Sequence, residues 1–188
     1  MLSIVLAVWK VLVLALRLHA VVPYIPLAQA TAHVAAAQAA ATPRVSAELL
    51  LAVAFVESRY DETATSRVEG TTRRTGHYPS SDAPANLAAH ASLYCGPLQT
   101  FAASWSECLA MRALPAAYRA GVAELETWLR DPRVRGSIVL ALAGHGCGNF
   151  GVTTGKCNEY PSRVLSIARL FAPPPPPRHV LARVLPRS

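Results

Sequence analysis

The stretch AELLLAVAFV at residues 47–56 constrains the fold more than any other part of the chain, because Glu48 is its one charged residue. A run this apolar is typical of a helix buried in a protein core. Thr42 followed by Pro43 is a suitable helix start, since proline is tolerated in the first turn. We therefore predict a buried helix of about four turns that ends near Val56.

The rest of the chain also favours helices over strands. Residues 62–92 are rich in Gly, Pro and Ser and predict a long mobile loop, of a length that commonly serves a function. Further helices are expected at residues 99–112 and 118–130, from 137 to 143, and at 161–171. No segment alternates convincingly as a strand. The predicted fold class is mostly α: a helical domain over residues 42–172 with at most a small β-hairpin within residues 62–96.

The N-terminal residues 1–30 form an apolar segment in which an apolar helix is expected. Lys10 and Arg17 fall on nearly the same helical face, which argues against a clean membrane span. Ala28 and Ala30 make a small-residue cleavage pattern, so the segment is predicted to be a signal peptide or a membrane anchor. The alternative is an amphipathic helix that lies on a membrane or packs on the core.

Two other segments are interpreted as spacers. Residues 31–41, TAHVAAAQAAA, have high helix propensity and little bulk to bury, which predicts an Ala-rich helical spacer. The prolines at 173–177 predict an extended, stiff segment, so residues 173–188 are expected to be a Pro-rich spacer with a basic tail.

The charge balance favours an anionic partner. The chain has 18 Lys and Arg against 11 Asp and Glu, for a net charge of +7. Nucleic acid, acidic lipid and acidic cell-wall polymer would all suit this charge. The basic residues are scattered and are not interleaved with aromatic residues along a stripe, so no nucleic-acid partner is predicted.

The four cysteines, Cys95, Cys108, Cys147 and Cys157, favour two disulfides in an oxidising compartment, with four buried thiols as the alternative. Three pairings are possible. Local closure favours Cys147 with Cys157 and Cys95 with Cys108. No cysteine pair has the spacing of a zinc knuckle, and His145 with Cys147 and Cys157 lacks metal-site spacing, so neither a metal nor a cofactor is expected.

Glu57 follows the apolar run directly and is the candidate catalytic residue. Desolvation and the negative end of a helix both disfavour its anionic form. A carboxylic acid kept protonated near neutral pH is what a general acid requires for cleaving a glycosidic bond, and the same group can then act as a base. A surface Glu57 paired with Arg59 is the plainer alternative.

Three ordered motifs give this carboxylate a context. They are VESRYDETATSR with Glu57, Ser58, Ala64 and Ser66; YCGPLQTF with Gly96, Leu98 and Gln99; and a helix start with Tyr160, Arg163, Val164 and Leu165. This order resembles the lysozyme-like lytic transglycosylases of the soluble-lytic-transglycosylase and goose-type lysozyme superfamily. The resemblance spans residues 47–171 and implies a lysozyme-like helical domain.

The sequence departs from the family pattern in two places. The family's Ala-Tyr-Asn-Ala-Gly motif is met only by AGHGCGN at residues 143–149, with His145 where Tyr is expected and Gly146 in place of Asn. In addition, residues 67–92 look like an insertion. This insertion could cover the cleft, bind a partner or supply a second carboxylate such as Asp82.

The resemblance implies a peptidoglycan lytic transglycosylase. Glu57 would protonate the glycosidic oxygen, the substrate's N-acetyl group would assist, and Glu57 as base would help the 6-hydroxyl close a 1,6-anhydro ring, which is an exception to the two-carboxylate scheme. Ser58 would orient Glu57 or cap the helix, and Tyr160 would hydrogen-bond Glu57. Gln99 would present its amide to an N-acetyl sugar. His145 would contact substrate or mark a turn near the cleft.

The expected partner is the glycan strand of peptidoglycan, with export to the periplasm or cell envelope, or association with a virion if the chain is phage-encoded. By analogy, the enzyme would open the wall for a secretion, conjugation or phage apparatus. A goose-type lysozyme, which would hydrolyse the same bond, and a non-catalytic wall-binding or virion structural protein are the alternatives. Membrane attachment through the N-terminus is a further possibility.

Overall fold

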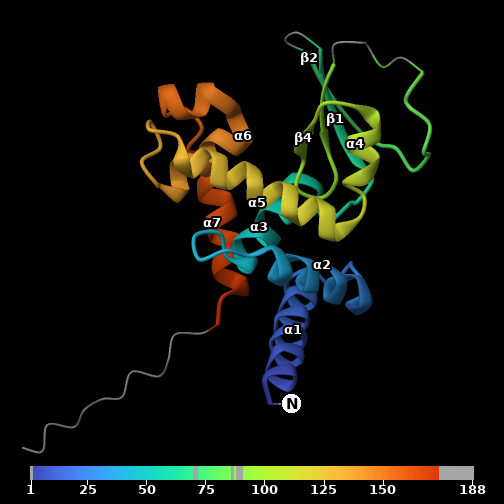
Figure 1. Cartoon of the computed structure of the whole chain (residues 1–188), viewed down its shortest axis with the longest axis vertical. Coiled ribbons are helices and arrows are strands. Elements are labelled where there is room, and N and C mark those ends of the chain that lie inside the picture. The colour runs from blue at the N-terminus through green and yellow to red at the C-terminus, as the bar shows by residue number, and fades with distance from the viewer. Residues whose placement is uncertain (1, 70–71, 86, 88–90, 174–188) are drawn as a thin grey trace, which may run out of the picture.

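The computed structural model describes residues 2–69, 72–85, 87 and 91–173 (Figure 1). Over these residues the chain is mostly helical with one small antiparallel sheet. The helices are α1 (Leu2–Val21), α2 (Leu27–Ala40), α3 (Ala47–Ser58), α4 (Trp105–Ala110), α5 (Leu114–Arg130), α6 (Ile138–Thr154) and α7 (Glu159–Phe171). The strands are β1 (Ala64–Glu69), β2 (Thr72–His77), β3 (Ser92–Cys95) and β4 (Thr100–Ala102). The mostly α fold class is confirmed.

Helix α3 is the buried helix that the sequence predicts, and α2, α5 and α7 pack against it. Its residues from Ala47 to Ala54 are buried apart from Glu48. The helix begins at Ala47 and not at Thr42, because the Ser46 side chain accepts a hydrogen bond from the Leu49 amide at 3.3 Å and caps the first turn.

The sheet has the strand order β2-β1-β3-β4, with every neighbouring pair antiparallel. Thr65 of β1 lies opposite Gly76 of β2 on one side and Cys95 of β3 on the other. The prediction of at most a small hairpin was therefore wrong. The strands are three to six residues long, and β2 is an exposed polar edge, so no alternation of apolar and polar residues marks them.

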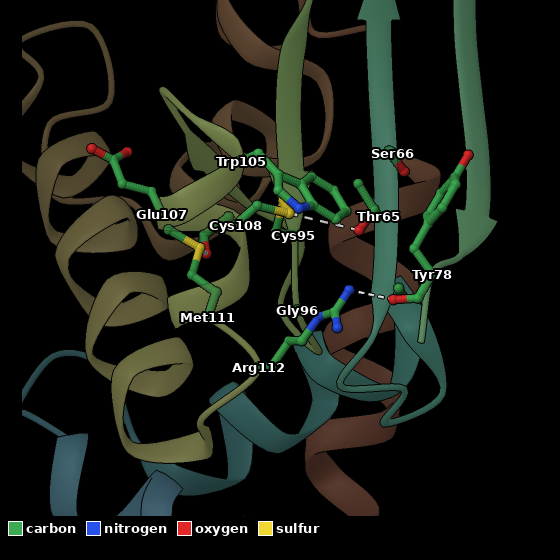
Figure 2. Close-up of a disulfide and its surroundings, with 12 residues drawn as sticks. Thr65, Ser66, Tyr78, Cys95, Gly96, Trp105, Glu107, Cys108, Met111 and Arg112 are labelled. Carbon is green, nitrogen blue, oxygen red and sulfur yellow. Dashed lines mark hydrogen bonds between the residues drawn. A yellow bond between two sulfur atoms is a disulfide. The ribbon is translucent and has the colours of Figure 1, made fainter. Parts of the chain in front are cut away.

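Two disulfides join Cys95 to Cys108 and Cys147 to Cys157, which confirms the local pairing. The first ties β3 to α4 beside the strand that carries Thr65 (Figure 2). Near it, the Arg112 guanidinium donates hydrogen bonds to the carbonyls of Tyr78 and Pro79, which fastens the chain after β2 to the loop after α4. The second disulfide ties α6 to the segment that precedes α7.

The N-terminal helices share the core of the domain. Leu14 and Leu18 of α1 and Val34 of α2 are buried in the same apolar cluster as the residues of α3. Among the described residues, the packing shows no break at residue 30 or residue 41, where the sequence suggested divisions. The predicted spacer at 31–41 is helical, as expected, but it lies in the core. The predicted Pro-rich tail lies outside the described residues from 174 onward.

The first half of α1 extends away from the body, on the side opposite the sheet (Figure 1). Apolar side chains there are exposed: Val5, Leu6, Val8, Trp9 and Leu12. No helix within the described part of the chain is both long enough and apolar enough to cross a membrane.

Candidate functional site

A cavity of about 730 Å³ lies between the sheet and α6. Its walls come from all four strands on one side and from the Gly144–Gly148 segment of α6 on the other, with a face of α5 between them. Figure 1 shows the sheet and α6 on the same side of α5. The Glu57 carboxylate at the end of α3 reaches this cavity, so the helix that forms the core also presents the candidate catalytic acid.

Glu57 is the penultimate residue of α3, and its side chain is only 12% exposed. The helix ends directly after it because Arg59 and Tyr60 both adopt the left-handed conformation, with φ of 59° and 68°. This sharp turn sends the chain into β1 and leaves Glu57 at the open end of the helix. Arg59 stacks over the Phe55 ring at 4.6 Å from its centre and makes no ion pair with Glu57 among the described residues.

His145 lies between two carboxylates. Its Nδ1 is 3.0 Å from Glu124 Oε1 of α5, and its Nε2 is 3.7 Å from Glu57 Oε1 and 3.1 Å from the Leu98 carbonyl oxygen. The imidazole is 1% exposed. Burial alone would lower the pKa of His145, but the hydrogen bond and charge of Glu124, the charge of Glu57 and the bond to Leu98 outweigh it and raise the pKa.

Tyr160, in the first turn of α7, faces Glu57. Burial raises the pKa of Tyr160, and the charge of Glu57 and a hydrogen-bonding interaction with its carboxylate raise it further. Among the described residues, no partner meets regular hydrogen-bond geometry at the buried hydroxyl. The ring lies against Gly146, where a Cβ would come within 2.6 Å of Tyr160 Cδ1. The absent side chain at 146 is what lets Tyr160 approach.

The chain beyond His145 leaves helical geometry at Gly148, whose φ of 59° and ψ of −152° kink α6. The Cys147–Cys157 disulfide lies beside this kink, and Cys147 lines the cavity. The disulfide therefore connects the segment that carries His145 with the segment that leads to Tyr160.

The polar side chains of Gln99 and Ser58 are engaged in hydrogen bonds that join neighbouring segments of the site. Gln99 Oε1 accepts a hydrogen bond from Ser66 at 2.7 Å, and Gln99 Nε2 donates to the carbonyls of Ala64 and Gly96, each at 3.0 Å. Ser58 Oγ donates to the Pro97 carbonyl at 2.9 Å and is not among the residues that line the cavity. Gln99 does line it, although its amide is occupied by these bonds.

Several cavity residues were missed by the sequence reasoning. Glu124 sits on the polar face of amphipathic α5, where a carboxylate is ordinarily solvated, so no local signal distinguishes it. Tyr94 and Phe101 lie edge to face, with ring centres 6.0 Å apart, and Arg73 stands over the Tyr94 ring at 5.9 Å. The basic pair at 73–74 was a usable signal for this wall. Asp82 is exposed and does not line the cavity.

Within the described part of the chain, no group of three or more His, Cys, Asp or Glu side chains is arranged to hold a metal ion. No protein-family model, curated protein or solved structure matches the chain.

Proposed function

We propose that the protein is a peptidoglycan lytic transglycosylase with Glu57 as its general acid and base. The observation that carries the proposal is a poorly exposed carboxylate at the end of a buried helix, opening into a cavity large enough for sugar units. Catalytic acids are commonly found in such partly desolvated clefts.

Contacts between the motifs that resemble the family support this proposal. Ser66 of the first motif bonds Gln99 of the second, Ser58 bonds Pro97, and the Leu98 carbonyl accepts from His145. Tyr160 of the last motif faces Glu57. Motifs that are far apart in the chain thus meet around one carboxylate, which is what a shared catalytic role would require.

In the proposed reaction, protonated Glu57 donates its proton to the glycosidic oxygen as the bond from that oxygen to the sugar's anomeric carbon breaks. The N-acetyl oxygen of the same sugar bonds to the anomeric carbon in its place. The Glu57 carboxylate then takes the proton of the 6-hydroxyl, whose oxygen displaces the N-acetyl oxygen and closes the 1,6-anhydro ring. No water is consumed, and Glu57 ends protonated as it began.

The cavity also suits the proposed substrate in shape and charge. Tyr94 and Phe101 offer aromatic surface to sugar rings, and Arg73 offers a cation to the carboxylates of the cell-wall peptide. The net charge of +7 favours the approach of an anionic polymer.

The test is mass spectrometry of sugars released from purified peptidoglycan by the full-length chain, because α1 and α2 belong to the core. Glu57→Gln, which keeps the shape and removes the acid, is the control. Anhydro-ended fragments from wild type alone are expected. Absence of any product from a folded wild-type protein would refute the proposal and favour a non-catalytic wall-binding protein.

A goose-type lysozyme is the second candidate, and Glu124 is the observation that favours it. Two-carboxylate glycosidases need a second acidic group near the general acid, and Glu124 lines the same cavity as Glu57. Fragments with reducing ends in the same assay would select this candidate, since water and not the 6-hydroxyl would then be the attacking group.

The two disulfides are consistent with an exported protein in an oxidising compartment. We propose action in the periplasm or cell envelope, for a secretion, conjugation or phage apparatus.

The exposed apolar half of α1 would attach to a lipid surface. Flotation with phospholipid vesicles should weaken in Trp9→Ser but not in Val139→Ser, which removes an exposed apolar residue from α6. Equal flotation of both variants would contradict lipid attachment through α1.

A further inference from the structure

Three ionisable side chains from three helices meet in a row beside the cavity. Glu57 comes from α3, His145 from α6 and Glu124 from α5, and the two carboxylates approach different nitrogens of one imidazole. The family resemblance assigns no role to Glu124, and it offers His145 only as a replacement for a tyrosine. The arrangement nevertheless places two ionisable neighbours in line with the candidate acid.

The hydrogen bonds fix where the protons lie. A backbone carbonyl can only accept, so the bond to the Leu98 oxygen requires a proton on His145 Nε2. His145 Nδ1 faces Glu124 Oε1 at 3.0 Å, so one further proton lies between these two atoms. If Nδ1 holds that proton, the ring is an imidazolium paired with an ionised Glu124.

Burial favours this charged pair over an isolated charge. A buried imidazolium is costly unless it is paired and hydrogen-bonded, and both of its N–H groups have acceptors here. The raised pKa of His145 agrees with this state. Among the described residues, Tyr160 from α7 lies near the imidazole, with ring centres 6.2 Å apart, and Arg73 from β2 acts on Tyr160 through its charge.

We infer that Glu124 and His145 form a positioning pair that holds a positive charge beside Glu57 and so sets the pH range in which Glu57 can donate its proton. The inference rests on the proposed function. His145 Nε2 is 3.7 Å from Glu57 Oε1, beyond hydrogen-bond range, so the ring acts on Glu57 through its charge. The pair is neutral as a whole, but its positive member is the one in contact with Glu57.

The perturbation is Glu124→Gln, which keeps the side-chain shape and can still hydrogen-bond Nδ1. Without the carboxylate, His145 should lose its second proton at a lower pH than in wild type, and its remaining proton should stay on Nε2. Loss of the positive charge favours the protonated form of Glu57, so Glu57 should ionise at higher pH.

The measurement is an NMR titration of the full-length protein, following the His145 ring and the Glu57 side-chain carboxyl carbon, with signals assigned through His145→Gln and Glu57→Gln. In Glu124→Gln the midpoint of His145 should fall by about one pH unit or more, and that of Glu57 should rise. Glu124→Asp keeps the charge on a shorter side chain and should retain part of the His145 shift; it also serves if Glu124→Gln does not fold.

Glu126→Gln is the matched control. It removes a carboxylate from the same helix, but from a side chain that bonds Thr42 and Arg44 away from the cavity. Both titrations should match wild type in this variant. If the alkaline limb of peptidoglycan cleavage moves upward only in Glu124→Gln, the effect reaches catalysis.

A His145 midpoint that is the same in wild type and Glu124→Gln would overturn the inference, as would a Glu57 midpoint that stays or falls while that of His145 drops. A wild-type protein that releases no sugar would refute the proposed function. The two titrations would still decide the pair in that case, because neither depends on turnover.

Discussion

Removal of the two disulfides, one at a time, should separate stability from function. The first bridge, Cys95–Cys108, closes a sequence separation of 13 residues, and the second, Cys147–Cys157, a separation of 10. Their places in the fold differ more than their lengths. The first lies in a small apolar cluster between β3 and α4, whereas the second lies beside the kink of α6, where Cys147 lines the cavity.

The chain-entropy relation gives a stabilisation of about 2.9 kcal/mol for the first bridge and about 2.7 kcal/mol for the second. The paired replacements Cys95→Ala with Cys108→Ala, and Cys147→Ala with Cys157→Ala, should therefore lower the free energy of unfolding by nearly equal amounts. Equilibrium unfolding in urea, followed by circular dichroism, measures both.

Activity should distinguish the two variants. Loss of the second bridge frees the α6 segment that carries His145 and the segment that precedes α7. The rate of peptidoglycan cleavage should therefore fall by about tenfold or more, because small misplacements of catalytic groups are costly. Loss of the first bridge should change cleavage little under conditions where the protein is folded. Equal activity losses would refute the role given to the second bridge, and stabilities that differ by more than about 1 kcal/mol would refute the entropic estimate.

Three further outcomes are expected. Tyr160→Phe should change the free energy of unfolding by less than about 1 kcal/mol, because the buried hydroxyl has no regular partner among the described residues. The same variant should lower the rate of cleavage by about tenfold, because Glu57 loses its neighbouring hydroxyl. An unchanged rate would contradict this. Arg73→Ala should raise KM for peptidoglycan by about tenfold and leave KM for neutral chitin oligosaccharides unchanged. An equal rise in KM for both substrates would show that the charge of Arg73 does not recognise substrate. Burial lowers the pKa of His33 to about 4, so as pH falls His33 is protonated in the unfolded chain before it is protonated in the folded protein. Urea unfolding should therefore show a loss of roughly 3 kcal/mol in the free energy of unfolding between pH 6.5 and 4. His33→Gln should lose less over the same range, and an equal loss would contradict this assignment.

Local sequence was sufficient for some elements of the fold and not for others. The apolar run before Glu57 predicted α3, because a continuous apolar surface has no stable place except a core. The short strands escaped notice because β2 is exposed and polar, and its pairing with β1 depends on partners elsewhere in the chain. The Ala-rich α2 was interpreted as a spacer because small side chains give no sign of burial, although Ala30 and Ala37 are fully buried.

The sequence by itself determined that Glu57 lies near the end of a buried helix and that the chain is mostly helical, and it favoured the pairing of neighbouring cysteines, because each of these depends on residues close together in the chain. Only the tertiary structure decided that α1 and α2 share the core, that four strands form one wall of the cavity and that Glu124 approaches Glu57 through His145. These depend on how α3, α5 and α6 pack. The spacing of side chains on separate helices is set by that packing, and no periodicity within a single helix encodes it.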